Sequence, residues 1–466
     1  MFSDGNGFKS TKLSGVIISQ SNTLKQRAIH AGMWTIGGHV MSQALRFGSN
    51  LIMTRLLFPE MFGLMAIVTV IMVGLALFSD LGLHQNIIQS KRGDDHDFLD
   101  TIWSVKIIRG GLIWVASVLI ALGLYLANAF DLLPKNTVYA NVLLPLIIPV
   151  ATLSVLISGF EPTWTSVATR RLQQSKITKI VLISQLFSIL VMLIWAHFDR
   201  SIWALVAGGI SASVARSIIA WNLVPEKKNK WLLEPDALNE IIHFGKWLFL
   251  SSILTFLFFS GDRLLLGGLI TAKELGIYTT AYFIVNAASQ VINRFLGDVA
   301  FPVLSESIRH KPENLINVYY RFRIPFDAGV LFLAGILFSS GSTIIHILYD
   351  GRYHDAGHMI EILSLTLIAT RYGITEQCFM ALGKPKIMTM LTALRTVTLF
   401  ALVPIIFAKY QLNGALWAIV VSYFIGFPLT IFYKYKFNIL SVRNEIITLP
   451  IFIIGSGAGL IFNKIF

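Results

Sequence analysis

An internal repeat constrains the fold of this chain more than any other feature. Residues 29–34 read Ile-His-Ala-Gly-Met-Trp, and residues 242–247 read Ile-His-Phe-Gly-Lys-Trp. The same offset of 213 (276 − 63) pairs Gly63 with Gly276. Each copy opens a long apolar segment, and the offset is a little under half of the 466 residues. The sequence therefore predicts two related lobes.

Composition shows which solvent these lobes occupy. Hydrophobic residues make up 55% of the chain and charged residues 14%, with a mean hydropathy of +0.68. A water-soluble core cannot absorb that much apolar surface, and a membrane-spanning helix needs about 20 apolar residues. We predict an all-α integral membrane protein with two pseudo-symmetric six-helix lobes, related as a parallel repeat around a central cavity, plus a C-terminal helix. The expected membrane segments are 30–55, 61–89, 98–127, 138–160, 178–198, 202–224, 241–269, 276–304, 324–348, 356–382, 387–408, 414–433 and 446–463.

Charge placement predicts the orientation. The chain carries a net charge of +13, and most basic residues between the apolar segments fall in the loops on one side. This bias is the positive-inside pattern, so we expect a cytoplasmic N-terminus and no nucleic acid partner. The expected parts are a cytoplasmic tail at 1–24, an N-lobe at 25–224, a cytoplasmic linker at 225–240, a C-lobe at 241–445 and a C-terminal membrane segment at 446–466.

Charged residues inside apolar segments are the candidates for function. A charge at the centre of a bilayer costs at least about 2.5 kcal/mol on insertion scales, so such residues face a watery cavity or one another. Basic residues outnumber acidic ones among them, which favours an anionic ligand. We predict that Arg46, Arg263 and Arg294 bind a diphosphate, because guanidinium groups grip phosphates through paired hydrogen bonds. Structural pairing is the alternative, with Asp262 beside Arg263 and Asp298 one turn after Arg294. We expect Lys106 and Arg109 to extend to the cytoplasmic surface of the membrane.

Three carboxylates are candidates for a gate or for ion coupling: Asp80, Asp262 and Asp298. The repeat offset places Asp80 at the level of Asn293 (80 + 213), next to Arg294. An ion pair between the lobes would be geometrically natural there.

Catalytic and metal chemistry are not indicated. The chain has no P-loop, Rossmann glycine pattern, nucleophile elbow or His-Glu-x-x-His motif. Cys378 is the only cysteine, so neither an intrachain disulfide nor a thiolate metal site can form. His346, His354 and His358 weakly resemble a metal site, but a solvated loop is favoured because their spacing fixes no ligand geometry. We expect no catalytic residues, no metal and no cofactor.

Several motifs resemble a known family. Arg-Leu-Leu-Phe-Pro-Glu-Met-Phe-Gly-Leu at 55–64 and Ser-Asp-Leu-Gly-Leu at 79–83 are similar to the start of Wzx-type polysaccharide or oligosaccharide flippases. Asp-Arg-Leu-Leu-Leu-Gly at 262–267 and Ala-Leu-Gly-Lys-Pro at 381–385 match later parts of that family. It belongs to the multidrug/oligosaccharidyl-lipid/polysaccharide exporter superfamily, whose members usually have 12 or 14 spans, whereas this sequence gives 13 segments.

The resemblance implies a function. It implies transport of a polyprenyl-diphosphate-linked oligosaccharide across the bacterial inner membrane for lipopolysaccharide or exopolysaccharide biosynthesis, by alternating access and without bond chemistry. In related flippases, cavity arginines meet the diphosphate, a role that would fall to Arg46, Arg263 and Arg294. Membrane lipids, a polysaccharide polymerase and a chain-length regulator are the implied partners. The main rival is a multidrug or cation antiporter of the same superfamily, which would need an acidic cavity. A membrane enzyme is a third class, but it would need a larger outward loop.

Overall fold

The computed structural model describes residues 11–79, 81–223, 228–310 and 312–465, and these residues form helices and no strands. The first half of the chain contains α1 (Thr11–Leu56), α2 (Pro59–Phe78), α3 (Leu83–Gln89), α4 (His96–Ala129), α5 (Leu144–Gly159), α6 (Trp164–Arg170), α7 (Gln174–Phe198) and α8 (Trp203–Asn222). The second half contains α9 (Pro235–Gly267), α10 (Ala272–Phe295), α11 (Phe301–His310), α12 (Leu315–Leu348), α13 (Asp355–Thr370), α14 (Gly373–Ala381), α15 (Pro385–Phe424), α16 (Phe427–Lys436), α17 (Val442–Ile446) and α18 (Pro450–Ile465).

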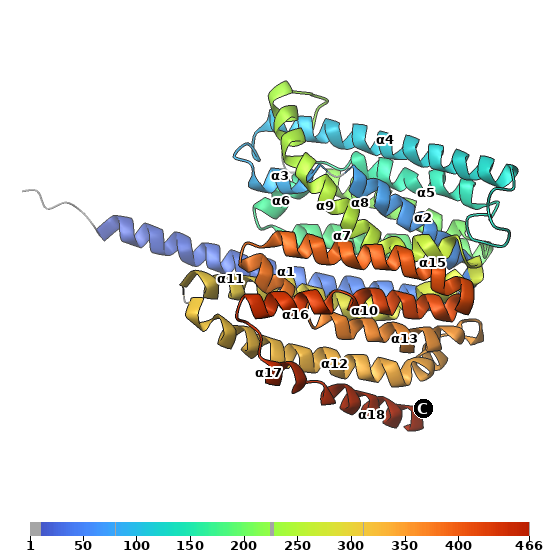
Figure 1. The fold of residues 1–466 in the computed structure, drawn as a ribbon. Helices are drawn as coiled ribbons and strands as arrows, with labels where there is room; N and C mark the ends of the chain where they lie inside the picture. Colours follow the sequence, from blue (N-terminus) through green and yellow to red (C-terminus); the bar gives the residue numbers. More distant parts are fainter. Residues whose placement is uncertain (1–10, 80, 224–227, 311, 466) are drawn as a thin grey trace, which may run out of the picture.

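The helices form two bundles that lie side by side (Figure 1). Helices from the first half, coloured blue to green, make one lobe, and helices from the second half make the other. Large apolar side chains such as Phe198 (83% exposed) and Val142 (80%) cover the outside. An outer surface of this kind suits lipid. The predicted all-α membrane fold with two lobes and an added C-terminal helix is confirmed.

By length and composition, eight helical stretches of the described residues are suited to crossing a membrane, or nine if the bent pair α5 and α6 counts as one span. One stretch, Pro385–Lys436, contains two of our predicted segments. The backbone breaks inside it at Gln411, whose φ is 52°. A second predicted segment, 61–89, is divided between α2 and α3. The expected total of 13 spans stays a prediction.

Two helices begin before the apolar segments of the sequence do, and the predicted domain bounds stay a prediction. Helix α1 begins at Thr11, so residues 11–24 of the predicted tail are helical. Helix α9 begins at Pro235, which leaves only 228–234 of the described linker without regular structure. Proline is well suited to the first helical turn because it has no N–H to leave unpaired. Helix α9 therefore begins at Pro235, before the apolar segment that starts at residue 241.

The repeat-related glycines meet between the two lobes, in the first turns of α2 and α10. A Cβ on Gly63 would lie 1.9 Å from the carbonyl oxygen of Ala272, and a Cβ on Gly276 would lie 1.8 Å from that of Pro59. Pro59 and Ala272 are themselves separated by 213 residues (272 − 59). The contact is therefore reciprocal, with α2 and α10 touching backbone to backbone about a pseudo-twofold axis. Both helices start at the same end of the bundle, as a parallel repeat requires.

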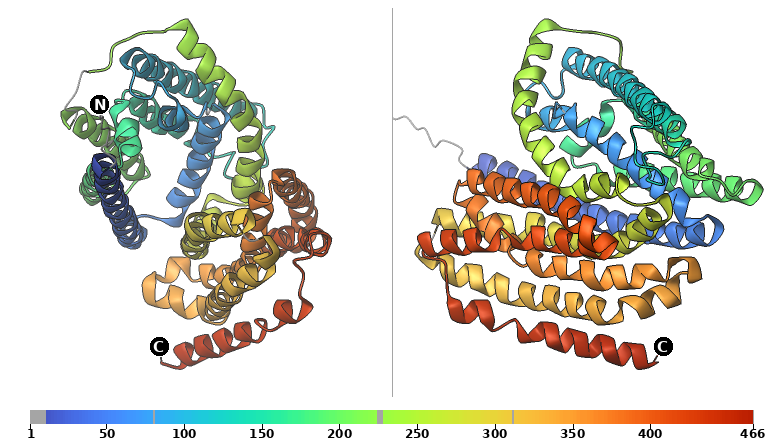
Figure 2. Two further views of the ribbon diagram at one scale, coloured as in Figure 1. Left: turned by 90° about the vertical axis from the view of Figure 1, so that its left-hand side faces the viewer. Right: turned by 45° about the vertical axis from the view of Figure 1, so that its right-hand side comes forward.

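Helix α9 runs from one lobe to the other (Figure 2). Its first turns pack in the N-lobe, where Ala237 and Ile241 are buried with Phe98 and Ile102. Near its end, Gly261 lies against Phe400 of α15 in the C-lobe. The helix thus joins the lobes mechanically. We call the end of the molecule that holds residues 228–234 the linker end, and the end where α1 stops and α2 starts the Pro59 end.

The C-terminal helix α18 lies along α12 on the outside of the C-lobe (Figure 1). Small residues allow the two backbones to approach closely. A Cβ on Gly455 would lie 2.3 Å from the carbonyl oxygen of Phe332, and a Cβ on Gly335 would lie 2.3 Å from that of Phe452. Such close packing is how helices associate in lipid, where no hydrophobic force drives them together.

Candidate functional site

The Pro59 end is closed by a loop of the C-lobe that binds the end of α1. The Arg352 guanidinium donates to the carbonyl oxygens of Thr54 (2.9 Å), Arg55 (3.1 Å) and Leu57 (3.1 Å). Asp350 holds the same guanidinium at 2.9 Å through Nε. The last carbonyl groups of a helix have no hydrogen-bond donors within the helix, and they carry partial negative charge. An arginine supplies both the donors and the positive charge.

The N-lobe makes the matching contact with the end of α9. The Tyr139 hydroxyl donates to the carbonyl oxygen of Leu264 at 2.8 Å, and its backbone N–H donates to that of Gly267 at 3.3 Å. Tyr139 and Arg352 are themselves separated by the repeat offset (352 − 139 = 213). Each lobe therefore caps the first helix of the other, and the Pro59 end is sealed on both sides of the pseudo-twofold axis.

A cavity of about 400 Å³ lies between the lobes, bounded by α1 and α10. The Gln43 amide donates to the Gln290 amide oxygen at 3.0 Å, and the rings of Phe47 and Phe283 stack with centroids 6.1 Å apart. We call this space the interlobe cavity. The residues lining it are His39, Val40, Gln43, Ala44, Arg46, Phe47, Phe283, Asn286, Ala287, Gln290 and Val291.

One of the three predicted arginines lines this cavity, and a second lies near it. Arg46 lines it and is exposed. Arg294 lies near His39, another lining residue, but does not itself line the cavity. Arg294 also pairs with Asp298, but at 3.9 Å and with the carboxylate 72% exposed, so this contact is weak.

Arg263 lies elsewhere, inside the C-lobe. Its guanidinium sits 4.4 Å from the centroid of the Tyr282 ring and 3.5 Å from the carboxylate of Asp262. It also donates to the carbonyl oxygen of Phe259 at 2.5 Å. The pairing alternative of the sequence analysis thus describes Arg263, and this arginine does not line the interlobe cavity.

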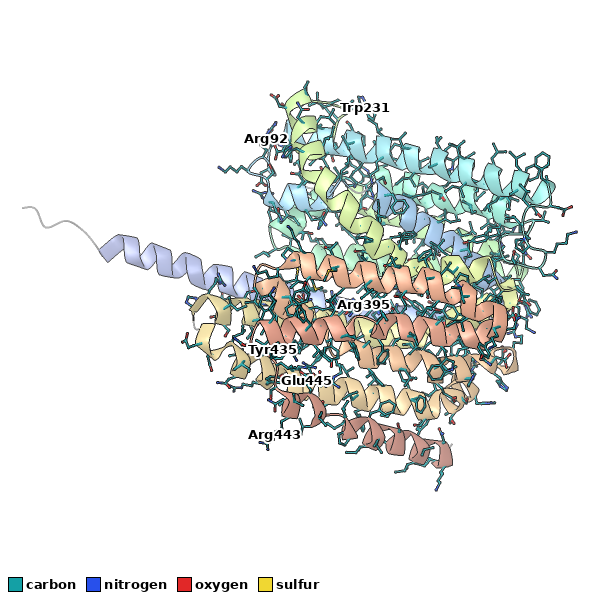
Figure 3. The ribbon with its side chains drawn as sticks, viewed as in Figure 1. Arg92, Trp231, Arg395, Tyr435, Arg443 and Glu445 are labelled. Carbon is teal, nitrogen blue, oxygen red and sulfur yellow. The ribbon has the colours of Figure 1, made fainter. Side chains whose placement is uncertain are left out.

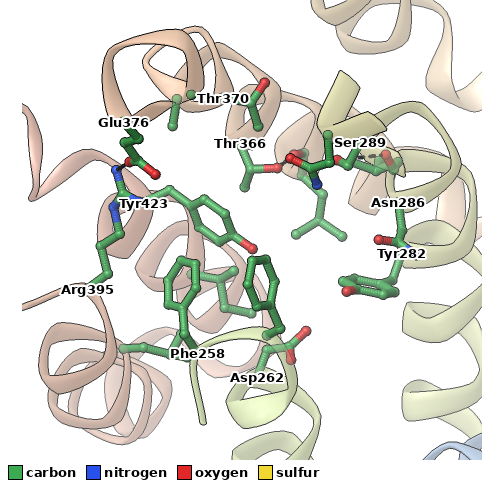
Figure 4. A pocket seen from close by; sticks show the side chains of 18 of the residues that line it. Phe258, Asp262, Tyr282, Asn286, Ser289, Thr366, Thr370, Glu376, Arg395 and Tyr423 are labelled. Atoms are coloured by element: carbon green, nitrogen blue, oxygen red, sulfur yellow. Dashed lines mark hydrogen bonds and ion pairs between the residues drawn. The ribbon is translucent and has the colours of Figure 1, made fainter. Parts of the chain in front are cut away.

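A second cavity, of about 170 Å³, lies within the C-lobe and is seen in Figure 4. Asp262 lines this cavity. The Tyr278 hydroxyl donates to its Oδ2 at 2.5 Å, whereas its Oδ1 accepts no hydrogen bond. On the far wall, Glu376 and Arg395 form an ion pair at 2.7 Å. Aromatic, hydroxyl and amide side chains fill the rest of the lining. Asn286 lines both this space and the interlobe cavity, so the two adjoin.

The N-lobe holds a basic pocket that sequence reasoning missed. It measures about 530 Å³ and lies between α2, α3, α4, α6 and α8 near the linker end. Its charged lining consists of Lys106, Arg109, Arg216 and Glu161, and His84 lines it as well. Lys106 and Arg109 resembled surface-reaching residues in the sequence. They face inward instead, with the Lys106 ammonium donating to the carbonyl oxygen of Glu161 at 2.9 Å.

The remaining charges within the spans of the C-lobe form a buried network. Arg323 is 1% exposed and donates to both Asp327 (3.2 Å) and Glu445 (2.6 Å), while Arg371 pairs with Asp327 at 3.0 Å. Lys434 also contacts Glu445, which is labelled in Figure 3. The network joins α12, α16, α17 and the residue that follows α13, and it fastens the C-terminal segment to the lobe.

Two predicted features need separate mention. Asp80 lies outside the described residues, so its expected ion pair stays a prediction. His346 and His354 stack with ring centroids 3.9 Å apart. Among the described residues, no three metal-ligating side chains gather in one place.

Comparison with models of known protein families shows which family the chain belongs to. The profile described as polysaccharide biosynthesis protein matches residues 52–356, which is more than half of the sequence. The chain belongs to this family. The predicted resemblance to polysaccharide flippases is thereby confirmed at the level of the family. A search of curated protein sequences found no match.

Solved structures with the same fold are multidrug and lipid transporters. The lipid II flippase MurJ in an inward closed conformation is similar with a TM-score of 0.65 and 11% identity over 93% of this chain and 92% of MurJ. An inward-facing MATE family transporter of the MOP superfamily gives 0.60 and 15% over 86% and 96%. A MOP superfamily transporter from Pyrococcus furiosus, described as having a binding pocket of reverse polarity, gives 0.51 and 17% over 88% and 95%. The chain shares its fold with these transporters.

Proposed function

We propose that this polysaccharide biosynthesis protein is a flippase for a polyprenyl-diphosphate-linked oligosaccharide. The observation that carries the proposal is the interlobe cavity, which Arg46 of one lobe lines and near which Arg294 of the other lobe lies. A ligand with two adjacent phosphates fits two guanidinium groups through paired, charge-assisted hydrogen bonds. Because one ligand would contact both lobes, binding of the ligand is also linked to the movement of one lobe relative to the other.

The position of the cavity suits a lipid-linked substrate. Val40 and Val291 line it and are 63% and 69% exposed, so the cavity is open at the seam between α1 and α10. We propose that the polyprenyl tail stays in the bilayer at this seam while the diphosphate enters. Transport then requires the seal at Arg352 and Tyr139 to open after the linker end has closed. No bond is made or broken in this scheme.

The orientation belongs to the proposal. We infer that the linker end faces the cytoplasm of a bacterium, with the protein in the inner membrane and its N-terminus inside. Reporter fusions after Lys228 and Arg352 should then report opposite sides of the membrane. Identical signals from the two fusions would contradict this topology. Polymerase and chain-length regulator remain the expected protein partners.

Substitution of the two arginines tests the function. Arg46→Gln and Arg294→Gln should abolish surface polysaccharide in a host that depends on this protein, while membrane insertion stays normal. Lys135→Gln is the matched control, because Lys135 is 82% exposed at the Pro59 end. Normal surface polysaccharide in both arginine variants would refute the assignment.

One observation favours a second function, the cation antiporter of the sequence analysis. Asp262 is 5% exposed and lines the C-lobe cavity, and its Oδ1 accepts no hydrogen bond and pairs only with Arg263 at 3.5 Å. Under the flippase proposal, Asp262 is a candidate for ion coupling, and Asp298 is a candidate for the gate. Asp262→Asn should then slow polysaccharide export, whereas an antiporter would lose drug resistance and leave polysaccharide unchanged.

A further inference from the structure

The charges around the C-lobe cavity are already paired. Among the described residues that line it, Asp262 lies 3.5 Å from the guanidinium of Arg263. The other lining carboxylate, Glu376, pairs with Arg395 at 2.7 Å. A buried charge is stable beside its counter-charge and costly without one, so a charged ligand would leave a charge unbalanced here. The lining therefore favours a ligand that is polar but carries no net charge.

Uncharged hydrogen-bonding groups make up much of the same lining. The side-chain amides of Asn286 and Gln377 form no hydrogen bond to any other residue that the structure describes. Each amide offers two donors and one acceptor oxygen. The Thr366 and Thr370 hydroxyls donate to carbonyl oxygens of their own helix, α13, at 2.6 and 2.7 Å, so their oxygens remain available as acceptors. A ligand hydroxyl, which both donates and accepts, can bind to groups of either kind.

Two charged side chains of the lining also have free hydrogen-bonding atoms. Asp262 Oδ1 and Arg395 Nε are buried and have no hydrogen-bond partner among the described residues. The two residues are only 5% and 9% exposed. Buried polar atoms are normally hydrogen-bonded, because bulk water does not reach them. An acceptor and a donor around one cavity again match the hydroxyl groups of a neutral ligand.

Aromatic rings supply the apolar part of the lining. Phe258, Tyr282 and Tyr423 lie around the space in Figure 4, and the rings of Phe258 and Tyr423 have centroids 4.9 Å apart. A sugar ring has apolar C–H faces and a rim of hydroxyl groups, so aromatic rings and amides together suit it. The cavity volume of about 170 Å³ is below the roughly 300–1,000 Å³ of pockets that hold drug-sized ligands. One sugar ring is therefore a better match than a multidrug substrate.

The C-lobe cavity adjoins the proposed diphosphate site. Asn286, on α10, lines both spaces, and the two cavities share no other described residue. They are therefore neighbouring sites and not one site. The glycan of a lipid-linked substrate is bonded to the diphosphate. A sugar of the glycan can thus reach the C-lobe cavity past Asn286 while the diphosphate stays between the lobes.

We propose that the C-lobe cavity binds one uncharged sugar ring of the glycan through hydrogen bonds to its hydroxyl groups. This inference rests on the proposed flippase function and adds a specificity site to it. Gln377 and Thr370 select the sugar, because they line this cavity and not the interlobe cavity. The interlobe cavity binds the diphosphate that all such substrates share.

Binding of synthetic probes to the full-length protein in nanodiscs tests this site. Four probes share a farnesyl diphosphate, which ends in glucose, galactose, N-acetylglucosamine or, as the sugar-free control, a methyl ester of equal charge. Each neutral hydrogen bond contributes a few-fold in affinity, so two or three of them amount to roughly tenfold. At least one sugar probe should therefore bind about ten times as tightly as the methyl ester probe.

Gln377→Met and Thr370→Val are the decisive variants, because each keeps the size of its side chain and removes hydrogen-bonding groups. Each should weaken binding of the preferred sugar probe by roughly fivefold and leave the affinity for the methyl ester probe unchanged. Unchanged methyl ester binding also shows that the variant is folded. Gln89→Met is the matched control and should change no affinity, because Gln89 is exposed in the N-lobe and lines neither cavity.

The inference is wrong if all three sugar probes bind no more tightly than the methyl ester probe. It is equally wrong if Gln377→Met and Thr370→Val keep the full preference for the sugar. A loss of affinity shared by the sugar and methyl ester probes would also overturn it, because the cavity would then bind a coupling ion or support the fold, and not the sugar.

Failure of the proposed function gives a different result. Arg46→Gln together with Arg294→Gln should weaken binding of all four probes by the same factor and leave the ratios of their affinities intact. If that double variant binds every probe as tightly as the wild type, the diphosphate assignment is wrong whatever the ratios show.

Discussion

Removal of the Arg352 side chain should open the Pro59 end. This guanidinium makes three hydrogen bonds to carbonyl groups of the α1 terminus, two of them at 3.1 Å and one at 2.9 Å. A hydrogen bond to a charged group contributes about 1.5–3 kcal/mol, but the side chain is 31% exposed and water replaces part of the interaction. We estimate a total of about 2 kcal/mol for the closed state, which is a roughly 30-fold change in the equilibrium.

Distance measurements between spin labels can detect this change. Labels at Lys135 of the N-lobe and Asp355 of the C-lobe report on the separation of the two loops at this end, since both side chains are exposed. Arg352→Ala should add a population with a longer distance. Arg55→Ala is the matched control, because it removes an arginine at the same end and leaves its accepting carbonyl in place. Identical distance distributions for Arg352→Ala and the wild type would refute the role of this seal.

Three further predictions concern stability and pH. Gly276→Ala should prevent correct folding, because the new Cβ would lie 1.8 Å from a backbone oxygen, whereas Gly123→Ala has open space and should fold normally by size-exclusion profile. The hydrogen bond from Arg352 lowers the pKa of Asp350 below its ordinary 3.8, so the pair stays ionised at neutral pH and is lost only as the pH falls through that lowered value. The spin-label distance should therefore stay constant between pH 8 and about 5. Glu445→Gln should lower the thermal unfolding midpoint by several degrees, because it leaves buried cations without their partner.

Each of these has a clear contrary result. A well-folded Gly276→Ala protein would show that the lobes do not touch there. A distance change between pH 8 and 5 would mean that another group controls the seal. An unchanged unfolding midpoint in Glu445→Gln would show that the buried network does not fasten α17 to the C-lobe.

The sequence predicted those features that depend on covalent order. The repeat offset placed Gly63 and Gly276 in equivalent positions, and the structure shows that they meet. The same offset connects Tyr139 with Arg352, but that pair carries no sequence similarity, because one seal uses a hydroxyl and the other a guanidinium. The two residues occupy equivalent positions but have different side chains, so no sequence motif marks them.

The direction of each charged side chain could not be predicted. In a soluble helix the apolar stripe marks the inner face, but in lipid the outer face is apolar too, so periodicity does not separate them. The apolar pattern therefore predicts that Lys106 and Arg109 reach the membrane surface, although they line a pocket. Arg263 was grouped with Arg46, although Tyr282 and Asp262 hold it inside the C-lobe. The orientation of these side chains depends on contacts between segments that are far apart in the sequence.

The central claim is that guanidinium groups from both lobes bind the diphosphate of a lipid-linked glycan. The most direct measurement follows a fluorescent polyprenyl-diphosphate oligosaccharide across the bilayer of liposomes containing the purified protein. The wild-type protein should move the probe to the opposite leaflet, and the Arg46→Gln and Arg294→Gln double variant should be at least tenfold slower, because each lost charge-assisted contact is worth about that factor. Equal rates for the double variant and the wild type would contradict the claim.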